Sequence, residues 1–264
     1  MPYATNRLDG VRTYVEDWAA DGPPILVYTG LGDPLEDAQE NPLVQALAPN
    51  HHLYFADHRG HGRSDKPHDD AAYALPTRVA DVVAVLDHFG LDSVHLLGFS
   101  WGARLGFAFG EHEPDRVRSL TLCGNQPYAW DPSWPPVPLL TRALDLAQGG
   151  GMKAFADFLE RAFGEKLPPQ ARERVLANDP QALAAAWRSA LAEGPVSANL
   201  SAWDLPCLIY MAVGEDMFAN AERAASEIPA ARFLALDGLT HLSAPYEVDQ
   251  VLPAVLALVA DAEG

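Results

Sequence analysis

The sequence predicts a mostly parallel α/β sheet that is flanked by helices and interrupted by one helical insertion. Up to about residue 124, short apolar runs typical of buried strands alternate with segments of helical periodicity. This alternation is typical of parallel sheets built from strand–helix–strand units. Between residues 125 and 204 the strand-like runs disappear, prolines cluster, and helical segments follow one another. We therefore expect a core domain formed by residues 1–124 and 205–264, with a helical cap formed by residues 125–204.

The individual elements follow from periodicity and from their end signals. A hairpin is expected first, because polar and apolar residues alternate from Tyr3 to Trp18 around Asp9 and Gly10. The other expected strands are 25–28, 53–56, 94–97, 117–123, 207–213 and 232–236. The expected helices are 42–47, 79–89, 101–111, 137–148, 152–163, 180–191, 219–228 and 248–259. Asn41 and Gly90 suit the ends of two of these helices, and the three glycines at 149–151 suit a break within the insertion.

Composition and charge restrict the class of partner. The 264 residues are 48% hydrophobic and 20% charged, which fits a folded soluble protein. The net charge of −18 repels phosphate backbones and anionic lipid, so we expect neither nucleic acid nor a membrane as partner. We expect no signal peptide, because residues 1–9 are polar, and no membrane span, because the apolar stretch at 252–260 is too short to cross a bilayer. We expect a cytoplasmic protein that binds a small-molecule substrate, and a homo-oligomer is compatible with the sequence.

The cysteines and histidines do not predict a metal site. Cys123 and Cys207 lie in apolar, strand-like runs, so we expect buried free thiols. Four histidines lie close together around one expected strand but lack the spacing of metal ligands: His51, His52, His58 and His61.

The G-x-S-x-G sequence at residues 98–102 indicates a nucleophile. Ser100 lies between an expected strand and an expected helix, where a tight turn brings neighbouring backbone close together. Gly98 and Gly102 have no Cβ atom to obstruct such a turn. We expect Ser100 to be held in a strained conformation with its hydroxyl exposed, facing the positive end of the next helix. An ordinary glycine-rich turn has the same pattern.

A serine nucleophile requires a base, and the base requires a carboxylate to orient it. His241 is the candidate base because it follows the last expected strand. Glu215 and Asp216 follow the strand before it and are the candidate acids. All these loops lie at the carboxyl ends of strands, where parallel sheets bind their ligands. The order Ser100, Asp216, His241 matches the order expected with this type of serine turn.

With these motifs the chain resembles the α/β-hydrolase superfamily over nearly its whole length. Residues 57–64 match the family's D-x-R-G-x-G-x-S loop, and residues 238–241 are similar to its catalytic-histidine loop. The resemblance implies the α/β-hydrolase fold and an oxyanion hole formed by the backbone N–H groups of Leu31 and Trp101. Thr29 stands where the family usually has histidine, but backbone donors survive a change of side chain.

The resemblance also bears on the acid and on the loop at 57–64. The family's acid commonly lies three residues after a glycine, whereas Asp216 lies only two residues after Gly214. Asp216 remains the preferred acid, with Glu215 as the alternative and the lack of a functional acid as a third reading. Asp57 and Arg59 are expected to be structural, bonded to the loop backbone and to each other.

We therefore expect a cofactor-free serine hydrolase that cleaves a small or medium, largely apolar ester through an acyl-enzyme. The serine argues against dehalogenation and epoxide opening, which the family performs with aspartate. Hydrolysis of a carbon–carbon bond and cofactor-free perhydrolysis are alternatives that use the same triad. A non-catalytic small-molecule-binding protein is an alternative of another class. Five aromatic residues of the insertion predict an apolar pocket: Trp130, Trp134, Phe155, Phe158 and Trp187.

Overall fold

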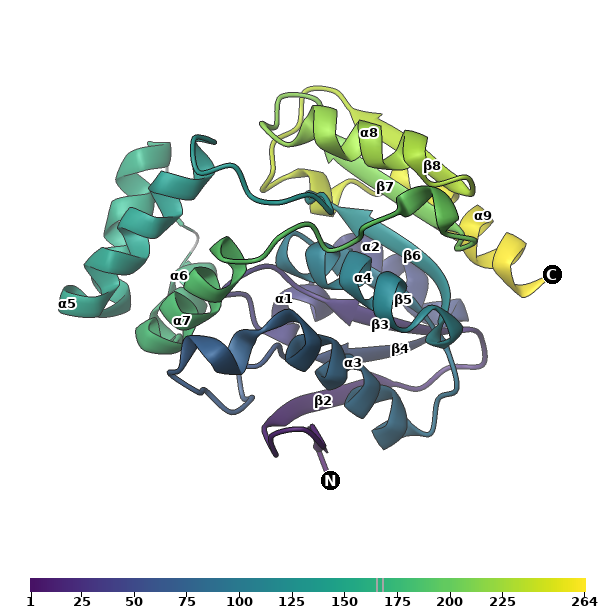
Figure 1. Ribbon diagram of the computed structural model, residues 1–264, viewed down its shortest axis with the longest axis horizontal. Coiled ribbons are helices and arrows are strands. Elements are labelled where there is room, and N and C mark those ends of the chain that lie inside the picture. Colours follow the sequence, from purple (N-terminus) through teal and green to yellow (C-terminus); the bar gives the residue numbers. More distant parts are fainter. Residues whose placement is uncertain (165, 168) are drawn as a thin grey trace.

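The computed structural model describes residues 1–164, 166–167 and 169–264, and its centre is an eight-stranded sheet of order β1-β2-β4-β3-β5-β6-β7-β8 (Figure 1). Two strand pairs are antiparallel, β1–β2 and β2–β4, and the other five pairs are parallel. The predicted mostly parallel sheet is thus confirmed. The strands are β1 (Tyr3–Thr5), β2 (Arg12–Trp18), β3 (Pro24–Tyr28), β4 (His52–Ala56), β5 (Val94–Phe99), β6 (Val117–Cys123), β7 (Cys207–Ala212) and β8 (Ala231–Leu236).

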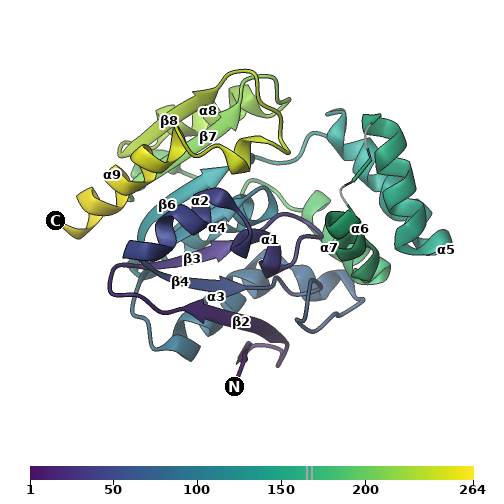
Figure 2. The ribbon, with the colours of Figure 1, turned by 180° about the vertical axis from the view of Figure 1, so that it is seen from behind.

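Helices cover both faces of this sheet. In the described residues they are α1 (Leu35–Gln39), α2 (Pro42–Leu47), α3 (Leu75–Phe89), α4 (Trp101–His112), α5 (Pro136–Phe163), α6 (Pro169–Ala177), α7 (Pro180–Leu191), α8 (Phe218–Glu227) and α9 (Val251–Glu263). Helices α3, α4 and α8 pack on one face, and α1, α2 and α9 pack on the other (Figures 1 and 2). None of the helices in the described ranges has the length and apolar content that a membrane crossing needs.

The alternation of side chains along β3 shows why both faces must be covered. Leu26 and Tyr28 join the apolar cluster of the first face, while Ile25 and Val27 join that of the second. Successive side chains of a strand point to opposite faces, so a strand that is apolar throughout requires a layer on each side. The short apolar runs of the sequence are therefore central strands of a three-layer core.

Several element ends form as the sequence predicts, and two helices were missed. Asn41 accepts hydrogen bonds from the backbone at the start of α2, and Gly90 ends α3 with a φ of 68°. Helix α3 begins at Leu75 rather than at residue 79. Helix α1 has only five residues, too few for a periodic pattern, and α6 has no buried residue that would produce one.

Helices α5, α6 and α7 lie together between β6 and β7 in sequence, and we call them the helical insertion (Figures 1 and 2). Its apolar cluster includes Trp101, and Leu31 packs against that cluster. These two residues follow β5 and β3, so the insertion covers the carboxyl ends of the central strands. A break at Gly151, with φ 67° and ψ −177°, interrupts α5 where a glycine break was predicted.

Candidate active site

Ser100 occupies a strained turn between β5 and α4. Its φ of 50° makes it the one non-glycine residue with positive φ in the described part of the chain. Its backbone N–H donates to the carbonyl of Cys123 at 2.7 Å, which ties the turn to β6. A Cβ on Gly98 would lie 2.5 Å from the Gly102 carbonyl, and one on Gly102 would lie 2.5 Å from the Tyr28 carbonyl oxygen. Only glycine fits either position, as the sequence predicts.

His241 connects Ser100 to a carboxylate. Its Nε2 atom lies 3.0 Å from Ser100 Oγ, and its Nδ1 atom lies 2.6 Å from Oε2 of Glu215. An ionised carboxylate can only accept hydrogen bonds, so Nδ1 carries the ring proton and Nε2 is free to accept the serine proton. The structure thus brings together three side chains from loops after β5, β7 and β8.

The carboxylate that contacts His241 is Glu215, and this corrects our expectation for Asp216. Glu215 follows the turn that ends β7, and its side chain folds back so that Oε1 accepts the Ala212 N–H at 3.3 Å. Its side chain is only 8% exposed. Asp216 lies on the exposed outside of the same loop. Sequence spacing could not choose between two adjacent carboxylates, because the choice depends on the path of the loop.

Gly124 provides the space that the imidazole occupies, and the sequence reading missed it. The residue follows β6 directly and has a φ of 72°. A Cβ at this position would lie 3.0 Å from Cε1 and 3.2 Å from Nδ1 of His241. The sequence did contain a signal for this role, because Gly124 directly follows β6, and β6 pairs with β5, the strand that leads to Ser100. The neighbouring Asn125 also contributes, because its Nδ2 donates to the Ser100 carbonyl at 3.0 Å.

Leu31 lies in the loop after β3, and Trp101 follows Ser100 directly as the first residue of α4. Neither backbone N–H donates a hydrogen bond within the described residues. The Gly102 N–H donates to the Thr29 carbonyl at 2.9 Å, which holds the loop after β3 against the start of α4. Thr29 stands where the family usually has histidine. Its hydroxyl donates a hydrogen bond to the backbone carbonyl of Asp33, which links the two ends of the loop at residues 29–33. The Trp101 N–H lies at the start of α4 and the Leu31 N–H in the loop after β3, and a pair of unpaired N–H donors is suited to hold a negative oxygen.

The charges around His241 favour the protonated form of its imidazole. Desolvation favours the neutral ring, but the hydrogen bond and charge of Glu215, together with the charge of Asp33, outweigh it and raise the pKa of His241. Burial raises the pKa of Asp33 itself to about 7, and the neighbouring Asp37 acts in the same direction. The sequence reading did not single out Asp33.

The loop at residues 57–64 is structural, as expected, but its pairing differs from the expectation. Asp57 accepts the backbone N–H groups of Leu35 and Arg63. Arg59 does not pair with Asp57, because its guanidinium contacts both oxygens of Asp81 at 2.6 Å. The expectation of an Asp57–Arg59 pair was therefore wrong. Arg59 instead links the loop after β4 to helix α3.

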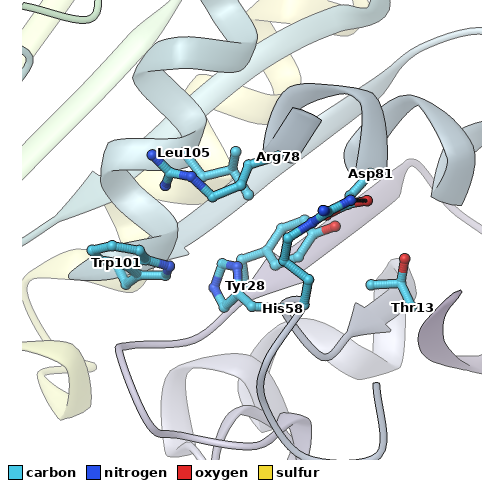
Figure 3. A pocket seen from close by; sticks show the side chains of 8 residues that line it. Thr13, Tyr28, His58, Arg78, Asp81, Trp101 and Leu105 are labelled. Carbon is cyan, nitrogen blue, oxygen red and sulfur yellow. Dashed lines mark hydrogen bonds and ion pairs between the residues drawn. The ribbon is translucent and has the colours of Figure 1, made fainter. Parts of the chain in front are cut away.

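Two hollows in the described residues are not lined by Ser100, His241 or Glu215. The first is a cavity of about 10 Å³ behind Trp101, which has room for about one water molecule and none for a substrate (Figure 3). Its lining residues are Thr13, Tyr28, His58, Arg59, Arg78, Asp81, Trp101 and Leu105. The second is an open polar hollow of about 510 Å³ lined by Lys66, His68 and residues 177–181.

The aromatic side chains of the insertion pack mainly on one another. Trp187 is 4% exposed, and its ring nitrogen donates to the Thr141 hydroxyl. Trp130 packs edge-on against Trp187 with ring centres 5.4 Å apart. Phe155 is also buried. These residues form the core of the insertion, so the sequence alone overstated their availability to a ligand.

The described residues contain neither a cluster of potential metal ligands nor an exposed cysteine. No group of three potential ligands from His, Cys, Asp or Glu is gathered there. Cys123 and Cys207 are buried free thiols, as predicted. Burial raises the pKa of Cys207 to about 12, so its thiol stays protonated and unreactive at neutral pH.

Comparison with known proteins agrees with the fold. A family model described as alpha/beta hydrolase fold matches residues 23–203, more than half of the chain. A putative carbamate hydrolase, RutD, from Caulobacter segnis is 27% identical over 248 residues, covering 87% of this chain and 88% of the relative. A solved hydrolase from Pseudomonas aeruginosa PA01 has a TM-score of 0.80 at 24% identity, covering 97% of each chain. An enol-lactonase from Burkholderia xenovorans LB400 has a TM-score of 0.80 at 21% identity, covering 98% of this chain and all of that one.

An α/β sheet with a strained serine in a G-x-S-x-G turn between a strand and a helix, beside a histidine and a carboxylate, is typical of the α/β hydrolases. The extent of the family match shows that this chain belongs to the alpha/beta hydrolase fold family. The solved structures, at their low identity, support the fold alone.

Proposed function

We propose that this protein is a serine hydrolase that cleaves a small or medium, largely apolar ester through an acyl-enzyme. The observation that carries the proposal is the chain of contacts from Ser100 Oγ through His241 to Glu215, with distances of 3.0 and 2.6 Å. Both distances are within the range for proton transfer and for orientation of the base. The triad of the proposal is therefore Ser100, His241 and Glu215.

In the first half of the reaction, Ser100 Oγ attacks the ester carbonyl while Nε2 of His241 accepts its proton. Glu215 holds the ring so that Nε2 faces the serine and stabilises the imidazolium that forms. The N–H groups of Leu31 and Trp101 donate to the oxygen as it becomes negative, and each such donor contributes about two to three orders of magnitude in rate. His241 then gives the proton to the leaving alcohol.

In the second half, water attacks the acyl-enzyme and His241 accepts a proton from it. The collapse of the second tetrahedral intermediate releases the acid and restores the Ser100 hydroxyl. The alternatives differ only in the acceptor or in the bond broken. Perhydrolysis replaces water with hydrogen peroxide, and carbon–carbon hydrolysis releases a carbanion that takes the proton from His241.

The substrate class is tested with a series of p-nitrophenyl esters from acetate to octanoate, measured on wild type and Ser100→Ala. We expect turnover that is greatest for short or medium acyl chains and that falls by about five to six orders of magnitude in the variant. A vinylogous diketone tests the carbon–carbon alternative in parallel.

A binding protein gives the opposite result in the same experiment. Turnover would be absent for every ester, and saturable ligand binding would be the same in wild type and in Ser100→Ala. The relative's printed name, a putative carbamate hydrolase, is compatible with acyl transfer, since a carbamate carbonyl is open to the same attack.

A further inference from the structure

One carboxylate beside the candidate nucleophile is not used by the proposed mechanism. Asp33 lies in the loop after β3, two residues beyond Leu31. A Cβ atom placed on Gly30 would lie 2.5 Å from Oδ2 of Asp33 and 3.7 Å from Cβ of Ser100. The carboxylate and the serine therefore border the same small space in front of the nucleophile.

The Asp33 side chain is open to solvent and at the same time surrounded by protein. The charge of Asp33 acts on His241 and on Tyr246, both of which belong to the loop region after β8. Asp33 therefore lies within electrostatic range of the candidate base.

No side chain in the described residues forms an ion pair or a hydrogen bond with the Asp33 carboxylate. The charge of His241, the backbone N–H of Gly30 and the charge of Arg174 favour its charged form, but Arg174 is already paired with Asp37 and Glu40. Burial raises the pKa of Asp33 to about 7 although the charges of His241 and Arg174 act in the opposite direction, so the charged form is poorly compensated. A bound cation would stabilise it.

The position of Asp33 also affects the chemistry. An uncompensated negative charge close to the serine repels the oxyanion that forms during attack. The repulsion disappears when the carboxylate takes up a proton or when the substrate brings a positive charge next to it. A neutral ester depends on the first route, and an ester that carries an ammonium group uses the second.

We propose that Asp33 is a specificity-determining residue whose carboxylate binds a protonated amine on the acyl part of the substrate. The preferred substrates are then small esters with an amine next to the carbonyl and an apolar side chain. Leu31, which is half-buried and lies two residues before Asp33, and Leu242, which is 64% exposed and follows His241, are the apolar residues next to these groups in sequence. The inference rests on the proposed ester hydrolysis and names its substrate class.

The test compares two methyl esters that differ only in the amine: L-leucine methyl ester and methyl 4-methylpentanoate. The values of kcat/KM are measured at pH 7 for wild type and for Asp33→Asn, with the spontaneous rate subtracted. Because an amine also changes the intrinsic reactivity of the ester, the readout is the ratio of the two values. We expect Asp33→Asn to reduce this ratio at least tenfold, mainly through a higher KM for the amino ester.

Asp237→Asn is the matched control, because Asp237 is an exposed carboxylate in the loop that leads to His241. It should leave the ratio unchanged. Asp33→Ala is measured as well, and it replaces Asp33→Asn if that variant does not fold. A ratio that stays within twofold of wild type in the Asp33 variants overturns the inference while the hydrolysis of the neutral ester still supports the proposed function. If wild type hydrolyses neither ester, the proposed function and the inference fail together.

Discussion

Oε2 of Glu215 lies 2.6 Å from Nδ1 of His241, while the adjacent Asp216 is exposed to solvent. The two acids are neighbours in sequence, and their side chains differ by one methylene group. Only one of them can orient the imidazole in this loop. The assignment of the triad acid thus depends on where the loop after β7 directs each side chain.

Replacement of the two neighbouring acids gives a matched pair of variants. Glu215→Gln keeps the shape of the side chain but removes the negative charge that holds the proton of His241 on Nδ1. The imidazole can then adopt the wrong tautomer, so kcat should fall by about four orders of magnitude. Asp216→Asn should leave kcat within about threefold of wild type. Both rates are measured on the best p-nitrophenyl ester. A large loss for Asp216→Asn and none for Glu215→Gln would reverse the assignment.

The pH profile of kcat/KM for a neutral ester should have its acid limb above the ordinary histidine value. Burial opposes this shift, but Glu215 and Asp33 raise the pKa of His241, so the ring stays protonated, and unable to accept a proton, up to a higher pH. Asp33→Asn removes one of the two anions and should move this limb to lower pH. A limb that does not move would show that Asp33 has no electrostatic contact with the base.

Gly124→Ala should reduce kcat about 10- to 100-fold, because the new Cβ would lie 3.0 Å from the His241 ring and displace it. Part of any effect could come from the positive φ of the backbone. Gly90→Ala is the control, since Gly90 has a φ of 68° but no atom within 4 Å of the added Cβ. This control should lose stability but keep its kcat.

The ion pair between Arg59 and Asp81 should be important for stability. Their side chains are 1% and 6% exposed, so the removal of Asp81 leaves the buried Arg59 charge with only the partly exposed Asp9 as its ion-pair partner. We expect Asp81→Asn to lower the free energy of unfolding by about 3–5 kcal/mol in urea denaturation. Arg232→Met breaks an exposed pair with Asp261 and should cost less than about 1 kcal/mol. Equal losses in both variants would contradict this difference.

The order of strands and helices was readable from the sequence because the central strands are apolar on both faces. The serine turn was readable because its two glycines are required by contacts that only a tight turn creates. Helix α6 could not be predicted from the sequence, because it has no buried face and therefore no periodic pattern of apolar residues.

The parts of the site that were missed depend on tertiary structure. Gly124 matters only because His241, more than a hundred residues later, packs on it. Asp33 matters only because its loop folds back toward Ser100. Glu215 and Asp216 could not be separated, because local sequence does not specify the direction of a side chain in an irregular loop.

The central claim is that Ser100 is activated by His241 and faces a formed oxyanion site. It is tested most directly by the intact mass of the protein after exposure to a small fluorophosphonate, for wild type and for Ser100→Ala. The account predicts a single adduct on wild type, formed with loss of fluoride, and none on the variant. An unmodified wild type under conditions that label a known serine hydrolase would contradict it.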